Sequence, residues 1–381
     1  MDYPLPEKVQ HLRDTVRRFI RNELEPLSQK VEEEEKIPEE IVQKMRNLGL
    51  FGLSIPEEYG GVGLSTLGEC VLLEDFGRVN ACFSIRFKAN IGIGSQGILI
   101  DGTPEQKKKY LPPIASGEWT AAFALTEPNA GSDSGNIQTK AVKKGGIYLL
   151  NGLKHFITHG DIADVVTVMA VTDKEKGPRG ITAFIVERTF PGYSVGKIDR
   201  KMGTHGSNTT EIIFEDCEVP IENVIGGVEG RGFSTAMKVL EKGRINIGAS
   251  CVGTAQYCLD LSIAHSKQRV QFGKPISDNQ AIQWMLADSA ISIYAGRQML
   301  YHTAWCRDQK KPVTREAAMV KVYCTEMVNR VVDAALQIHG GMGYMKESPI
   351  ERIYRDVRLF RIFEGTSEVQ RMVIARELLK D

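Results

Sequence analysis

One glutamate near the end of the chain, Glu364, has neighbours that suit proton chemistry. It lies in the run RIFEGTSE over residues 361–368, at the junction of two predicted helices. The aromatic residue before it favours burial, which raises the pKa of a carboxylate, and the glycine after it lets a substrate approach the backbone. Glu364 is therefore a candidate general base. Taken alone, the pattern fits a structural carboxylate better, and Arg352, Arg355 and Arg358 fit a solvated or salt-bridged helix face.

A second candidate site is the run FALTEPNAGSD over residues 123–133, which leaves a predicted strand and turns sharply. The hydroxyls of Thr126 and Ser132, with the backbone N–H groups around Gly131, are suited to hydrogen-bonding a planar heterocycle or a phosphate. On its own, this run fits a surface turn better than a binding site.

A formal match to the dinucleotide fingerprint, GIGSQG at residues 92–97, does not indicate a nicotinamide enzyme. That fingerprint needs a strand before it and a helix opening at its last glycine, followed by an acidic residue on a second strand. Here the sequence runs directly into Asp101-Gly102-Thr103-Pro104, which ends any helix within two turns. The glycines instead indicate close approach of helices or of a ligand.

The composition excludes several classes of protein. The 381 residues include 48 basic and 48 acidic side chains, so the formal net charge is zero and nucleic acid is not an expected partner. The N-terminus resembles no signal peptide and no stretch of about 18 apolar residues occurs, so we expect a soluble protein without membrane insertion. The seven cysteines are scattered without a C-x-x-C pair and the histidines lack ligand spacing, which predicts neither disulfides nor a metal site.

Three stretches of different periodicity predict three domains. Apolar residues recur at helical spacing from Glu7 to about Gly117, and helical spacing returns after Gly230, where Thr314 is a candidate N-cap. Between them, short β-rich runs alternate with turn residues. We therefore predict helical residues 1–118, a β domain at 119–229 and helical residues 230–381. With no helical pattern between the strands, we expect a small antiparallel barrel or sandwich.

With these elements in order, the sequence closely resembles the acyl-CoA dehydrogenase family over essentially its whole length. Any one of the shared motifs is weak, but five in family-like order and spacing are specific. They are LTEP with AGSD (residues 125–133), FIT (156–158), RVQFGK (269–274), QIHGG (337–341) and FEGT (363–366).

The resemblance implies a mainly α fold with a central β domain: an N-terminal helical bundle, a middle antiparallel β-barrel or sandwich, and a C-terminal four-helix bundle. It also implies FAD, a homotetramer and electron transfer to an electron-transfer flavoprotein. The residues implied to contact FAD are Phe123, Leu125, Thr126, Ser132, Phe156, Thr158, Thr366 and Glu368, with Arg269, Gln271, Phe272, Asn279, Gln280, Gln337 and Gly341 reaching the FAD of a neighbouring subunit. Those implied to contact substrate or its CoA are Ser132, Glu241, Arg244, Gly365 and Arg376.

By the same resemblance, Glu364 removes the α-proton of an acyl-CoA thioester while the β-hydride passes to flavin N5, giving a trans-2-enoyl-CoA. Donors must polarise the thioester carbonyl, and the family uses the glutamate's own backbone N–H and a ribityl hydroxyl of FAD. Some members carry the base immediately before the arginine that matches Arg244. This chain has Gly243 there, so Glu364 is the predicted base.

Two departures from the family concern the flavin and the substrate. Phe156 stands where many members have Trp, which keeps stacking and loses an indole donor. Arg86 and Lys88 stand on a pocket-lining helix where uncharged residues are more usual. If Arg86 faces the pocket, it suits an acyl chain with a polar or carboxylate end, but we favour a surface position or an ion pair with a nearby acid.

The predicted function is FAD-dependent α,β-dehydrogenation of an acyl-CoA. The alternatives are an oxidase that returns electrons to oxygen on the same scaffold, and a catalytically silent CoA-binding homologue. The length argues against the larger oxidases, and the intact Glu364-Gly365-Thr366 argues against a silent protein. We expect a cytoplasmic bacterial protein, or a mitochondrial matrix protein if the chain is a processed eukaryotic one.

Overall fold

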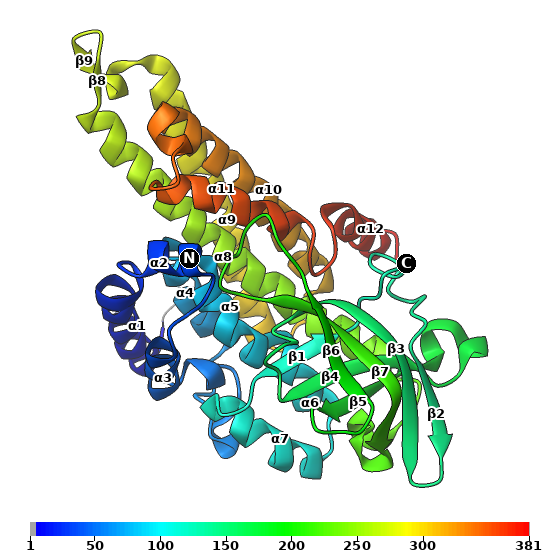
Figure 1. Cartoon of the computed structure of the whole chain (residues 1–381). Coiled ribbons are helices and arrows are strands. Elements are labelled where there is room, and N and C mark those ends of the chain that lie inside the picture. The colour runs from blue at the N-terminus through cyan, green and yellow to red at the C-terminus, as the bar shows by residue number, and fades with distance from the viewer. Residues whose placement is uncertain (1–4, 381) are drawn as a thin grey trace.

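The computed structural model describes residues 5–380, and within them helices, a sheet and further helices follow one another along the chain (Figure 1). The first part is helical, as predicted. Its α-helices are α1 (Glu7–Phe19), α2 (Ser28–Glu34), α3 (Glu39–Asn47), α4 (Thr66–Asp75), α5 (Ala81–Ala89), α6 (Ser95–Asp101) and α7 (Pro104–Ser116).

Local sequence signals explain where these helices start. At α7, the Thr103 side chain accepts from the Gln106 N–H and the Gln106 side chain accepts from the Thr103 N–H, so two otherwise unpaired donors are satisfied. Pro104 follows at the first helical position, where its missing N–H costs nothing. In the region of the glycine fingerprint, a π-helical turn (Asn90–Gly94) runs directly into α6 with no strand before it. These glycines therefore lack the strand–turn–helix context of a dinucleotide-binding fingerprint, as predicted.

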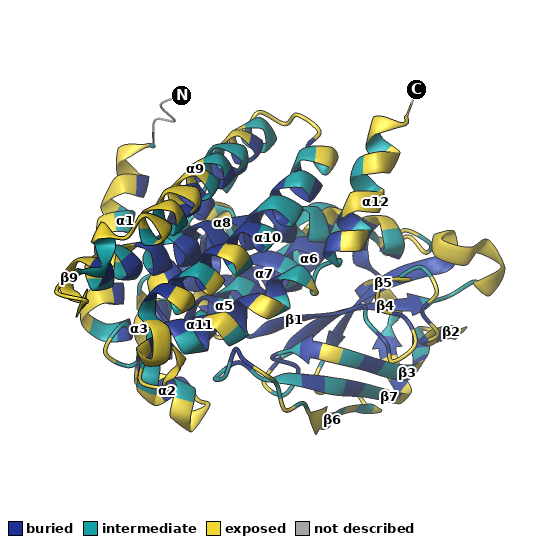
Figure 2. Ribbon diagram, turned by 90° about the horizontal axis from the view of Figure 1, so that it is seen from above, coloured by how far each residue is buried: buried dark blue, intermediate teal, exposed yellow. Residues whose placement is uncertain are grey.

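The middle part is a curled mixed sheet. Its strands are β1 (Ala121–Ala124), β2 (Lys140–Lys144), β3 (Ile147–Thr158), β4 (Val165–Val171), β5 (Ile181–Glu187), β6 (Tyr193–Ile198) and β7 (Thr209–Pro220). They are ordered β1-β4-β2-β3-β7-β6, with β5 also paired to β4. Figure 2 shows this sheet beside the helices, with buried residues concentrated where the two meet.

The prediction of a purely antiparallel sheet is wrong for two of its pairings. β1 runs parallel to β4, from Ala121 opposite Val165 to Ala124 opposite Val168, and β2 touches β4 in the same sense. The connection from β1 to β4 contains the β2–β3 hairpin and no helix. Parallel pairing therefore arises here without the helical pattern that a βαβ unit would leave in the sequence.

The last part is again helical and contains the longest helices. It comprises α8 (Gly232–Gln268), α9 (Gln280–Asp308), α10 (Thr314–His339), α11 (Pro349–Arg358) and α12 (Ser367–Leu378), with a small hairpin of β8 (Val270–Gln271) and β9 (Lys274–Pro275) between α8 and α9. The predicted cap of α10 is one residue off, because Val313 occupies the cap and Thr314 is the first helical residue. The helix ends at His339, and Gly340 forms its C-cap with a φ of +58°.

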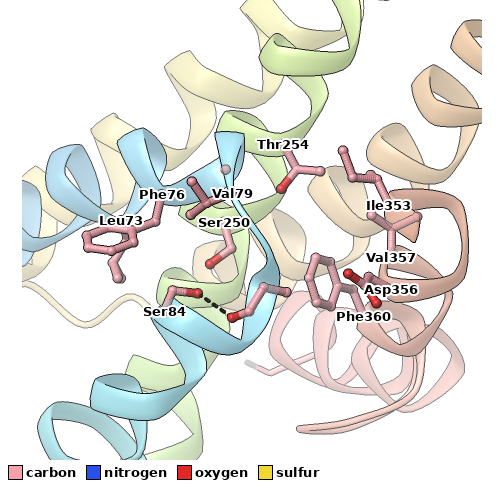
Figure 3. A pocket seen from close by; sticks show the side chains of 12 residues that line it. Leu73, Phe76, Val79, Ser84, Ser250, Thr254, Ile353, Asp356, Val357 and Phe360 are labelled. Atoms are coloured by element: carbon pink, nitrogen blue, oxygen red, sulfur yellow. Dashed lines mark hydrogen bonds between the residues drawn. The ribbon is translucent and has the colours of Figure 1, made fainter. Parts of the chain in front are cut away.

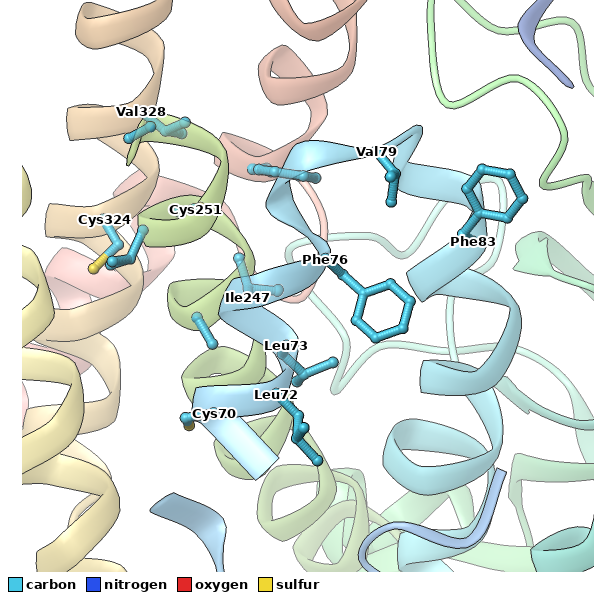
Figure 4. Packing of buried hydrophobic residues seen from close by; sticks show 14 of the residues in the cluster. Cys70, Leu72, Leu73, Phe76, Val79, Phe83, Ile247, Cys251, Cys324 and Val328 are labelled. Atoms are coloured by element: carbon cyan, nitrogen blue, oxygen red, sulfur yellow. The ribbon is translucent and has the colours of Figure 1, made fainter. Parts of the chain in front are cut away.

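The N-terminal and C-terminal helices share one apolar core. Side chains from α4 and α5 meet side chains from α8 and α10 in a single buried cluster (Figure 4). The backbones also approach closely, since a Cβ at Gly253 of α8 would overlap the carbonyl of Glu74. The labelled members of the cluster are Cys70, Leu72, Leu73, Phe76, Val79, Phe83, Ile247, Cys251, Cys324 and Val328.

Within residues 5–380, no helix combines the length and apolarity that a membrane crossing requires. The same residues bring together no group of three or more His, Cys, Asp or Glu side chains that could hold a metal ion. The seven cysteines are free thiols.

Candidate active site

Glu364 lies on a strained turn between the short helix Leu359–Arg361 and α12. Its φ is +53°, in the left-handed region that side chains other than glycine seldom adopt, and Gly365 follows at +91°. Thr366 then caps α12 by accepting from the Val369 N–H. Such strain persists only when the surroundings impose it, and it concentrates at functional sites.

The Glu364 carboxylate is buried against the backbone of α8. Its Oε2 atom is shielded from solvent and has no hydrogen-bond partner. A Cβ atom at Gly243 would overlap that oxygen, so only glycine leaves room for the carboxylate in this position. A buried oxygen with no partner is costly and marks a place where a ligand group belongs.

Burial raises the pKa of Glu364 to about 7, opposed by the positive charges of Lys88, Arg244 and Lys321. These side chains come from α5, α8 and α10, so three helices surround one carboxylate with positive charge. A carboxylate with a pKa near neutrality accepts a proton far better than an exposed one, and it is about half ionised at pH 7 and largely ionised at slightly alkaline pH.

Two side chains hold the backbone around Glu364. The buried Lys321 donates from Nζ to the Gly365 carbonyl at 2.7 Å, and burial lowers the pKa of Lys321 to about 8. Gln370 Nε2 lies 3.3 Å from the carbonyls of both Glu364 and Gly365. The left-handed turn is thus fixed from α10 and from α12.

Other predicted substrate contacts divide into those near Glu364 and those away from it. Arg244 is buried, its Nε has no partner, and its charge acts on Glu364. Glu241 is instead committed to an ion pair with Arg307 at 2.8 Å and accepts from Thr314. Arg376 is exposed on α12 beside Glu377.

The predicted flavin-binding run from Phe123 to Ser132 is held in shape by a buried carboxylate inside it. Glu127 accepts from the backbone N–H groups of Gln138 and Thr139, from the Thr139 hydroxyl, and from Lys154 Nζ at 2.7 Å. Phe123 and Leu125 are buried, Thr126 is half-buried and Ser132 is exposed. The turn therefore presents hydroxyls and backbone groups from a rigid frame.

Phe156 offers an exposed aromatic face next to this turn. Its side chain is 61% exposed and its φ is +58°, at an irregularity in the pairing of β3 with β7. The preceding residue, His155, donates its backbone N–H to the Thr126 carbonyl at 2.9 Å, which ties the two segments together. Thr158, half-buried, lies two residues further along β3. The Phe156 ring stacks on that of His155 at 3.9 Å, and its remaining exposed surface suits a planar heteroaromatic ligand.

A second set of predicted FAD residues lies at the β8–β9 hairpin, far from Glu364. In Figure 1 this hairpin projects at the opposite end of the helices from α12. Phe272 at its tip is fully exposed with φ of +52°. The end of α10 lies beside it, since His339 stacks on His265 near the end of α8 at 4.3 Å. The exposed members of this set are Arg269, Gln271, Phe272, Asn279, Gln280, Gln337 and Gly341.

The favoured interpretation of Arg86 is wrong. Its guanidinium is buried, its Nη1 has no partner, and it forms no ion pair within the described residues; it lies instead over the Phe51 ring at 5.1 Å. Burial lowers the pKa of Arg86 to about 10. The charges that act on Glu364 do not include Arg86 but do include Lys88, two residues further along α5. The positive charge that α5 contributes near Glu364 is therefore that of Lys88.

Sequence reasoning missed the residues that support the site. Lys321 interrupts an otherwise apolar face of α10 between Ala317 and Cys324, and a lysine at a core position was the available signal. Nothing in the local sequence indicated that Glu127 and Lys154, which are 27 residues apart, form a buried pair.

Comparison with known proteins gives matches over the whole of this architecture. Family models match in chain order: "Acyl-CoA dehydrogenase, N-terminal domain" at residues 6–118, the middle domain at 122–217 and the C-terminal domain at 230–379. The chain belongs to the acyl-CoA dehydrogenase family. Family members are oxidoreductases that act on a CH–CH group of an acyl-CoA, and so is this protein.

Three relatives illustrate the similarity. The caffeyl-CoA reductase-Etf complex subunit CarC of Acetobacterium woodii is 45% identical over 375 residues, covering 98% of this chain and 99% of that protein. The structure of butyryl-CoA dehydrogenase from Megasphaera elsdenii superimposes with a TM-score of 0.96 at 40% identity and covers all of both chains. A Bacillus anthracis acyl-CoA dehydrogenase complexed with FAD superimposes with a TM-score of 0.91 at 36% identity, covering 98% of this chain and 68% of that one.

FAD is the cofactor of this acyl-CoA dehydrogenase. The residues present fit such a group. The exposed ring of Phe156 and the half-buried hydroxyls of Thr126 and Thr158 belong to segments that a backbone hydrogen bond joins.

Proposed function

We propose that this acyl-CoA dehydrogenase removes the α-proton of an acyl-CoA thioester with Glu364 and forms a trans-2-enoyl-CoA. One observation carries the proposal: the Glu364 carboxylate is buried over Gly243, surrounded by three cationic side chains, with an unpartnered oxygen. This arrangement suits a base that waits for the proton of a ligand.

The proton step requires a polarised thioester carbonyl, because an α-C–H is otherwise too weak an acid for a carboxylate. Within the described residues, the backbone N–H of Glu364 has no hydrogen-bond acceptor. We propose that it donates to the thioester oxygen, where negative charge develops. Lys321 and Gln370 fix this N–H by holding the neighbouring carbonyls.

Bound FAD supplies the acceptor for the hydride that leaves the β-carbon. We propose that Phe156 packs against its ring while Thr126, Thr158 and the turn at 123–132 hydrogen-bond its polar edge. Glu127 keeps that turn in place through its four hydrogen bonds. Buried Arg244, with an unpartnered Nε, is placed to bind substrate oxygens.

Anaerobic mixing with butyryl-CoA tests the role of Glu364. In the Glu364→Gln variant, loss of the flavin's visible absorbance should slow by about a thousandfold, because the amide cannot accept the proton. Glu215→Gln, at an exposed position of β7, is the matched control, and it should retain the wild-type order of magnitude. Wild-type rates in Glu364→Gln would disprove the assignment.

We further propose that an electron-transfer flavoprotein reoxidises the reduced enzyme. The relative CarC, named as a subunit of an Etf complex, supports this partner. Reoxidation of dithionite-free, substrate-reduced enzyme should be fast with an electron-transfer flavoprotein and slow with oxygen. Rapid peroxide formation with oxygen alone would instead support an oxidase.

We also propose a homotetramer built from domains at 1–118, 119–229 and 230–381, in the cytoplasm of a bacterium. Support for assembly comes from the exposed FAD-binding candidates at the β8–β9 hairpin, which projects at the opposite end of the helices from α12 (Figure 1). The bacterial source of the relatives described above supports the location.

A further inference from the structure

The small cavity between α4, α5, α8 and α11 does not suggest a second ligand site. Its volume is about 20 Å³, which accommodates about one water molecule (Figure 3). Two of its polar side chains already donate to backbone carbonyls, Ser84 to Ala81 at 3.1 Å and Ser250 to Asn246 at 3.3 Å. A single buried water therefore accounts for this space.

The side chain of His155 covers part of the Phe156 ring. The two ring centroids are 3.9 Å apart and the ring planes are inclined by 14°. Successive side chains of a regular strand point to opposite faces of the sheet, so neighbouring residues stack only where the strand is irregular. Here the pairing of β3 with β7 shifts between Lys154 and Ile157, and Phe156 has a φ of +58°. This bulge brings the two rings together and leaves the remaining surface of Phe156 exposed.

Two carboxylates lie at the edge of the His155 ring. Its Nε2 atom is 3.7 Å from Asp199 Oδ1 and 3.9 Å from Glu211 Oε1. Glu211 belongs to β7, and Asp199 follows β6 and donates its backbone N–H to the Thr209 carbonyl at 2.8 Å. Asp199 Oδ2 is buried and has no hydrogen-bond partner. The three side chains thus form one charged group beside Phe156.

The charges in this group oppose one another during flavin reduction. A flavin that accepts a hydride gains two electrons, so its ring becomes more negative unless it takes up a proton. Asp199 and Glu211 disfavour that change, because like charges repel, and a protonated His155 offsets one of them. Lys201 is a further cation that acts on Asp199, but its Nζ donates to the Ser207 carbonyl at 2.6 Å. His155 is the cation that touches both carboxylates and the Phe156 ring.

We propose that His155 favours reduction of the bound flavin, because its positive charge beside Phe156 offsets the negative charge of Asp199 and Glu211. The inference rests on the function proposed above, in which Phe156 packs against the flavin ring. His155 acts on the flavin through the Phe156 ring and the local charge, and takes no part in the proton step at Glu364.

The reduction potential of the bound FAD, measured in the holoenzyme against a reference dye at pH 6.0, tests this role. That pH is below the ordinary histidine pKa of about 6.5. His155→Phe keeps an aromatic ring and removes the charge, so the flavin equilibrium should shift about tenfold towards the oxidised form, or about 30 mV for two electrons. His155→Arg keeps a planar cation and should stay within about twofold of the wild type. His11→Leu, at an exposed position of α1, is the matched control and should change nothing.

Removing one carboxylate should reverse the effect. In the double variant His155→Phe/Asp199→Asn, most of the lost potential should return, because one of the two negative charges is gone. Asp199→Asn alone should shift the equilibrium towards the reduced form, which keeps the inference testable if His155→Phe fails to fold. A wild-type potential in His155→Phe would overturn the inference. So would an equal loss in His155→Arg, since packing would then be responsible, or a double variant without recovery.

A failed inference is distinguishable from a failed function, because dye-linked reduction does not need Glu364. If the His155 variants keep the wild-type potential while Glu364→Gln loses reduction by butyryl-CoA, the proposed function stands and the role of His155 is lost. If the potentials shift as expected while Glu364→Gln reacts at the wild-type rate, the charge effect stands and the proposed base is lost.

Discussion

The properties of Glu364 come from opposing effects on a single carboxylate. Burial favours its neutral form, while Lys88, Arg244 and Lys321 favour its charged form, and the outcome is a pKa of about 7. An exposed glutamate would be ionised at neutral pH but too weak a base, and an unopposed buried one would remain protonated. The cations therefore set the pH range in which the proposed base would be ionised.

The pH dependence of the free enzyme should report this pKa. Because the base must be ionised, kcat/KM should fall about tenfold for each pH unit below about 7 and level off above it. Stopped-flow flavin reduction between pH 5.5 and 8.5 measures this limb. A profile that stays flat down to pH 5.5 would show that the unliganded carboxylate has an ordinary pKa.

Gly243 makes room for the base, and replacing it should damage catalysis without damaging the fold. In Gly243→Ala the new methyl group should displace the Glu364 carboxylate, which is the flexible end of a side chain. We therefore expect kcat to fall about a hundredfold. The melting temperature should hold, since alanine favours helix. Gly146→Ala, with open space around it, is the control. Full activity in Gly243→Ala would show that the carboxylate need not lie there.

The sequence predicted Glu364 as the base, which stays a proposal, and it did not predict the surroundings of this carboxylate. An aromatic residue and a glycine flanking Glu364 are local signals, visible without a structure. The cations come from three helices more than 40 residues apart, and their convergence depends on packing. Arg86 and Lys88 were equally unusual in the sequence. They differ in the direction in which α5 presents them, since Arg86 lies over the Phe51 ring and Lys88 donates to the Ser250 hydroxyl.

At the scale of elements, the buried pair of Glu127 and Lys154 joins the predicted flavin-binding run at residues 123–132 to β3. Breaking one partner of a buried pair leaves an uncompensated charge. In Lys154→Met, urea unfolding should show a loss of about 3–5 kcal/mol, and FAD should dissociate more readily as the turn loosens. Lys144→Met, on exposed β2, is the matched control and should be neutral. Unchanged stability in Lys154→Met would mean that the pair contributes nothing net.

The elements also show what sequence patterns could not predict. The two helical stretches and the β-rich middle stretch carry clear periodicity, and helices and strands appear in the stretches predicted for them. β2 and β6 carry little, because only one residue of Lys140–Lys144 is buried and none of Tyr193–Ile198 is. Because the sequence of β2 does not predict a strand, the β2–β3 hairpin could not be recognised, and the parallel pairing of β1 with β4 could not be predicted.

At the scale of the molecule, the β8–β9 hairpin should contribute to a neighbour's FAD site. Phe272→Asp should weaken assembly, seen as a smaller sedimentation coefficient, and should yield protein with less bound FAD, because a charge replaces a fully exposed aromatic ring. Val142→Asp, at an exposed position of β2, should change neither property. A Phe272→Asp protein whose assembly has the wild-type sedimentation coefficient and binds a full complement of FAD would rule out this role.

The core shared by the two helical parts has a consequence for how the chain matures. The apolar faces of α4 and α5 are completed by α8 and α10, which follow more than 150 residues later. During synthesis, the first helices therefore leave the ribosome without the surface that will cover them, and they must wait for most of the chain before their core can close. The buried pair of Glu69 and Lys242 likewise waits for α8. The early part of this protein is exposed to chaperones and to aggregation for most of its synthesis.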